Sequence, residues 1–217
     1  GAFICEVNGQ PNLGQTTAAH LYIPLIRKLV SGSGRVPTVL VLGAANSKHW
    51  SDAILNAFVK RGLKVGVVSQ EHVVIGQETV REGKISSYAG GQMLAMSREV
   101  DAMAFVINDE DLLRTGLPVA RFDVLVFAGG SAQSGQEYPK WHAQGGVGDL
   151  LLSLLPACDG AVIKVPGSGL DEHAIDLHTT VDCLTLDGSV ADIADKTVEL
   201  AVVCAARRDS LLEDVEV

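Results

Sequence analysis

The chain has 217 residues, of which 47% are hydrophobic and only 5% aromatic, and its formal net charge is −9. This acidic balance argues against nucleic-acid binding, which needs a basic face, and no apolar run approaches the ~20 residues that span a membrane. The four cysteines are scattered without a CxxC pair, and the first residues lack signal-peptide features. We therefore expect a cytoplasmic protein with one large domain, or one domain plus a fragment.

The first part of the chain predicts a short strand and a helix. Residues 3–7 alternate in polarity and are rich in strand formers, and the leucines that follow recur at helical spacing as far as residue 29. The sequence SGSG at 31–34 is the clearest linker in the chain. We therefore divide the chain into three parts: a strand–helix segment over 1–30, a linker over 31–36, and an α/β domain over 37–217.

The larger part predicts strands that alternate with helices. We expect strands at 38–42, 64–69, 102–107, 123–128, 160–165 and 180–186, and a hairpin formed by 72–76 with 84–85. Helices are expected at 52–61, 93–97, 149–155 and 190–208. Such alternation indicates an α/β fold with a mostly parallel sheet and helices on both faces.

The end of the predicted strand at 38–42 is where a phosphate-binding loop would lie, because ligands of such sheets bind where strands end and helices begin. A working loop needs glycines around the phosphates, a lysine for the outer phosphates, and a following hydroxyl for magnesium. Gly43 and Lys48 are present, but Ser47 replaces the expected glycine and His49 the hydroxyl. The candidate nucleotide-binding residues are Gly43, Asn46, Ser47 and Lys48. The ordinary alternative is a strand-to-helix turn with a solvent-facing lysine.

A second candidate site lies near the start of the chain. Glu6 and Asn8 lie two residues apart in the first predicted strand and therefore on one face of it. A carboxylate beside an amide oxygen suits a magnesium ion that bridges nucleotide phosphates. The alternative is an ordinary strand edge.

The long polar stretch at 131–148 is a candidate binding loop, with Trp141 and His142 as residues that could face a ligand or cover the core. His173 and His178 are five residues apart, a spacing that does not favour a metal pair on one helical face.

The order of these pieces resembles the cyanophycin synthetase family of ATP-dependent amide ligases. In that family an ATP-grasp domain ends with a strand of type E-V-N-x-x-P-G, and a linker leads into a Mur-ligase-like domain that opens with G-T-N-G-K-T. This chain has Glu6-Val7-Asn8, then Pro11, and later "GRVPTVLVLGAANSK". The stretch "VDAMAFVINDEDLLRTGLPVARFDVLVFAGGSA" also follows the family in length and hydrophobic pattern. The resemblance covers residues 4 to about 190 and implies that 1–30 is the end of an ATP-grasp domain.

The departures from the family fall on functional positions. The family's magnesium-binding glutamate falls on Val106, its asparagine on Gly129, and its Asp-His pair on Gln133-Ser134. Valine cannot coordinate a cation, and a phosphate loop without its glycine binds phosphate less well. We therefore expect no turnover of ATP by the Mur-like domain.

Three hypotheses follow. In the first, the chain is the C-terminal part of such a ligase, with an inactive Mur-like domain that acts as a scaffold or oligomerisation platform. The upstream ATP-grasp region would be its partner, the whole would form a homo-oligomer, and the parent enzyme would use ATP and Mg²⁺, with Glu6 and Asn8 as metal ligands. The second is a non-catalytic module that binds a nucleotide or peptide. The third is an active Mur-type ligase in which Asp109, Glu110 or Asp111 takes over the metal.

Overall fold

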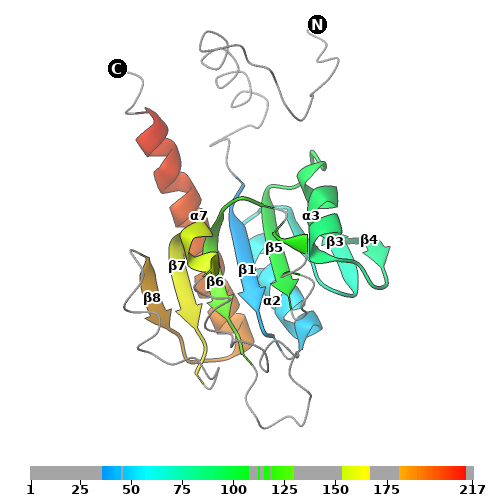
Figure 1. The fold of residues 1–217 in the computed structure, drawn as a ribbon, viewed down its shortest axis with the longest axis horizontal. Coiled ribbons are helices and arrows are strands. Elements are labelled where there is room, and N and C mark those ends of the chain that lie inside the picture. The colour runs from blue at the N-terminus through cyan, green and yellow to red at the C-terminus, as the bar shows by residue number, and fades with distance from the viewer. Residues whose placement is uncertain are drawn as a thin grey trace, which may run out of the picture. The chain divides into compact units, whose positions relative to one another are not determined.

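The computed structural model describes residues 36–44, 46–107, 112, 115–117, 119–129, 153–166 and 181–213, with side chains described as far as 207 (Figure 1). The strand–helix segment predicted at 1–30 and most of the linker predicted at 31–36 lie outside this part, so the predicted domain division stays a prediction. No helix within the described residues is long and apolar enough to cross a membrane.

Eight strands form one sheet in the order β4-β3-β2-β5-β1-β6-β7-β8. In this sheet order, each pair of neighbouring strands from β2 through β5, β1, β6 and β7 to β8 is parallel. β3 is antiparallel to both β2 and β4, and the β3–β4 hairpin extends one edge of the sheet. The strand bounds are β1 Thr38–Leu42, β2 Val65–Val68, β3 His72–Ile75, β4 Glu78–Glu82, β5 Ala102–Ile107, β6 Phe122–Phe127, β7 Cys158–Lys164 and β8 Asp182–Thr185. The mostly parallel α/β fold expected from the sequence is confirmed.

Helices cover both faces of the sheet. The described helices are α2 Ser47–Val59, α3 Ser87–Ala95 and α7 Val190–Glu213, with a short 3₁₀ turn, η3, at Leu155–Ala157. α2 and α7 pack on one face, where their apolar residues join the valines of the central strands, and α3 packs on the other. Because both faces are covered, β1 and β6 are buried throughout.

The hairpin at the sheet edge differs from the prediction. A two-residue turn at Gly76 and Gln77 joins β3 to β4, so the second strand is Glu78–Glu82 and not 84–85. Gly76 has φ of +60°, a conformation that glycine adopts without strain. The prediction was wrong here because every residue of β4 is exposed, and its polar sequence ETVRE carries no apolar alternation.

Two helices begin earlier than predicted, because side-chain caps decide where they start. Asn46 caps α2, and its Oδ1 accepts from the backbone N–H of His49 at 3.0 Å. Ser86 caps α3, and its Oγ accepts from the backbone N–H of Ala89 at 3.2 Å. Caps of this type satisfy backbone donors that the first helical turn leaves unpaired.

The start of α7 is capped by a reciprocal pair. The backbone N–H of Ser189 donates to Asp192 Oδ2 at 3.2 Å, and the backbone N–H of Asp192 donates to Ser189 Oγ at 3.2 Å. The Ser189 hydroxyl also donates to Asp192 Oδ2, at 2.5 Å. These hydrogen bonds from the Ser189 side chain and backbone lower the pKa of Asp192 from its ordinary value of 3.8.

This cap predicts a pH dependence. Because the folded-state pKa of Asp192 is depressed, the carboxylate stabilises the fold above pH 3.8, and its contribution is lost as the pH falls through the folded-state pKa. We expect Ser189→Ala to move the pKa of Asp192 back toward 3.8, measured by carboxyl-carbon NMR titration. An Asp192 pKa that stays unchanged in the variant would show that the serine does not set it.

Candidate functional site

The candidate phosphate loop leaves the carboxyl end of β1, between β5 and β6. Gly43 follows the strand with φ of +73°, and its backbone N–H donates to the carbonyl oxygen of Ile107 at 3.1 Å. A Cβ atom at Gly43 would lie 3.2 Å from the Cα of Gly129, which follows β6. Glycine is therefore required here by backbone conformation and by the close approach of the next loop.

Asn46 and Ser47 lie at the start of α2. The Asn46 side chain is occupied as the helix cap, and the backbone carbonyl oxygen of Asn46 accepts from the backbone N–H of Trp50 at 3.2 Å. Trp50, in the first turn, is only 5% exposed and packs into the core beneath the helix. The cap and this anchor fix the first turn of α2 against the sheet.

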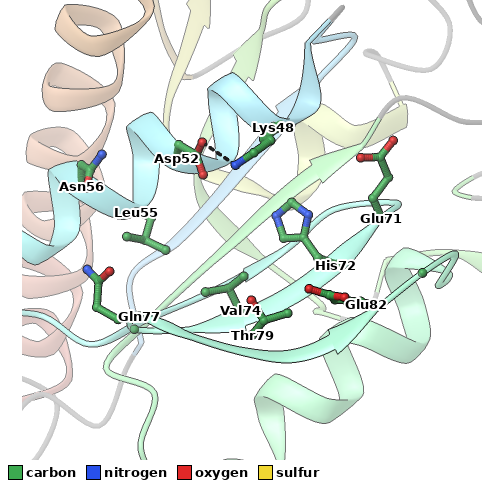
Figure 2. A pocket seen from close by; sticks show the side chains of 12 residues that line it. Lys48, Asp52, Leu55, Asn56, Glu71, His72, Val74, Gln77, Thr79 and Glu82 are labelled. Carbon is green, nitrogen blue, oxygen red and sulfur yellow. Dashed lines mark hydrogen bonds and ion pairs between the residues drawn. The ribbon is translucent and has the colours of Figure 1, made fainter.

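Lys48 is directed along the helix and not over the loop. Its Nζ lies 2.9 Å from Asp52 Oδ2 one turn later, and both side chains are exposed, at 70% and 53% (Figure 2). An exposed pair at this spacing is worth about 0.3–0.5 kcal/mol. The structure therefore brings the four predicted nucleotide-binding residues together at one strand-to-helix turn, with the lysine side chain paired to Asp52.

Two functional positions of the family that the resemblance places on this chain, Val106 and Gly129, lie in the described part of the site, and neither offers a polar side chain. Val106 is fully buried in β5, in register with Val41 of β1, and belongs to the core beneath α2. Gly129 offers no side chain. Among the residues that the structure describes, no group of three or more His, Cys, Asp or Glu could hold a metal ion.

The remaining candidates fall outside the described residues. They are Glu6 and Asn8, the acidic run 109–111, Gln133 and Ser134, Trp141 and His142, and His173 and His178. Their assignments stay predictions.

A cleft of about 670 Å³ lies beside α2 and was not predicted from the sequence. Its wall is the outer face of α2, and its floor is the face of the β3–β4 hairpin (Figure 2). The residues of α2 that line it are Lys48, Asp52, Leu55 and Asn56. The hairpin side is lined by Glu71, His72, Val74, Gly76, Gln77, Thr79, Glu82 and, directly after β4, Gly83. The volume is in the range of small-molecule sites.

Local geometry explains how these side chains meet. Positions 48, 52, 55 and 56 recur at helical spacing and share one face of α2. Across the hairpin, His72 pairs in register with Glu82 and Val74 with Thr79, so these four side chains share one face of the two strands. The sequence signal for the cleft was the mostly polar face of α2 formed by positions 48, 52, 55 and 56. This pattern does not indicate which segment of the chain packs opposite that face.

The His72 ring is held by Ser69. Ser69 Oγ lies 3.0 Å from His72 Nδ1, and it also accepts from the backbone N–H of His72 at 3.2 Å. Ser69 is fully buried, so this contact fixes the ring from below while the imidazole extends from β3 toward α2 (Figure 2).

Comparisons with known proteins show the fold. No protein-family model matches the chain, and no curated protein is significantly similar to it. Its structure is similar to that of a UDP-N-acetylmuramoyl-L-alanyl-D-glutamate–2,6-diaminopimelate ligase, with a TM-score of 0.50 and 12% sequence identity. The match covers 76% of this chain and 34% of that ligase, so the chain spans about a third of the length of the protein it resembles. The likeness therefore shows a Mur-ligase-like α/β fold and, at this identity, the fold alone.

Proposed function

We propose that the chain is part of an ATP-dependent carboxylate–amine ligase similar to cyanophycin synthetase, and that its Mur-ligase-like domain is catalytically inactive. In the whole protein, an upstream ATP-grasp region would activate a carboxylate as an acyl phosphate for attack by an amine, with Glu6 and Asn8 as magnesium ligands. The Mur-like domain would serve as a scaffold or as an oligomerisation platform for that region.

The observation that carries this proposal is the state of Val106. The core around it is complete, yet the side chain that would be a metal-binding carboxylate is a fully buried valine in the strand next to β1. Mg²⁺ needs oxygen ligands, and an aliphatic side chain supplies none. A buried valine at the position where the resemblance places the metal-binding glutamate supports the proposal that the fold is kept without the metal-binding side chain.

The residues at the loop do not fit ATP with Mg²⁺. Ser47 replaces the glycine that would let backbone N–H groups wrap a phosphate, and His49 replaces the hydroxyl that would hold the metal. Lys48, which would reach the outer phosphates, is paired with Asp52. No step of a ligase reaction is therefore assigned to these residues.

A second candidate is a nucleotide-binding module without turnover. It is favoured by the geometry of Gly43, whose left-handed turn leads into the N-terminus of a 13-residue helix. Helix N-termini attract phosphate through their unpaired backbone N–H groups and the helix dipole. In this candidate, Gly43 and Lys48 retain enough of the loop to hold a nucleotide.

Repairing the loop tests which substitutions disable it. We expect the double variant Ser47→Gly, His49→Thr to give a heat of ATP binding that the native chain does not give, because it regains the phosphate-wrapping glycine and the metal-binding hydroxyl. Both positions are at least partly exposed, so the fold should tolerate the change. The readout is ATP titration with Mg²⁺ by calorimetry. Equal affinities in the two proteins would contradict the account of the loop.

A further inference from the structure

We draw no further inference here: the strongest candidate, the N-terminus of α2 with the buried hydroxyl of Ser51 one turn into the helix, which has no hydrogen-bond partner among the described residues, belongs to the strand-to-helix turn already described as the candidate nucleotide site.

Discussion

Trp50→Ala is expected to lower the free energy of unfolding by about 4 kcal/mol, because it removes a large buried side chain and leaves a cavity. Trp50 is 5% exposed and packs in the core beneath α2 together with Ile54 and Phe58. Trp50 lies two residues after Lys48 in the first turn of α2. The packing of Trp50 in the core therefore fixes the turn that follows the candidate loop, and the same turn contributes to one wall of the cleft. The measurement is urea unfolding followed by circular dichroism at 222 nm.

The control for this variant is Val59→Ala on the same helix. Val59 is 41% exposed, so its truncation should cost less than about 1 kcal/mol. A Trp50→Ala cost close to that of the control would mean that α2 is not anchored through its first turn, and the geometry of the loop would need another explanation.

Gly160→Ala is the second change with a large expected effect, a loss of about 3 kcal/mol. A Cβ atom at this position in β7 would lie 2.5 Å from the backbone oxygen of Asp123 and 2.7 Å from Cys204 Sγ. The sulfur could move, but the backbone oxygen belongs to β6, which pairs with β7. Overpacking against fixed backbone forces the strands or α7 apart.

Gly62→Ala provides the comparison for Gly160→Ala. At Gly62 nothing lies within 4 Å of the added Cβ, but φ is +75°, so the cost there is backbone strain of about 1 kcal/mol. Thermal unfolding of the two variants separates steric overlap from strain. If Gly160→Ala were no less stable than Gly62→Ala, β7 and α7 would have to be able to separate without cost.

Much of the fold could be predicted because its central strands are buried on both faces. The continuous apolar runs TVLVL and AMAFVI gave the bounds of β1 and β5 correctly, since no polar residue interrupts them. By contrast, β4 was missed because its residues are exposed and polar. The starts of α2 and α3 were placed too late because single capping side chains, Asn46 and Ser86, determine them.

The candidate site likewise has a part that could be predicted from the sequence and a part that could not. The turn from Gly43 to Lys48 is local in sequence, so its residues could be predicted as a group. The pairing of Lys48 with Asp52 was not predicted, although the four-residue spacing permits it. The cleft could not be predicted, because Asp52 and Glu82 lie thirty positions apart and meet only through the packing of α2 beside the hairpin.

The central claim is that the Mur-ligase-like domain does not bind ATP productively, and calorimetric titration of the chain with ATP and Mg²⁺ tests it most directly. Lys48→Ala serves as the control, because it removes the only loop side chain that could pair with the outer phosphates. We predict no heat of binding and no thermal shift in either protein. Magnesium-dependent binding to the native chain that disappears in Lys48→Ala would contradict the claim, since the loop would then be a working nucleotide site despite Ser47, His49 and Val106.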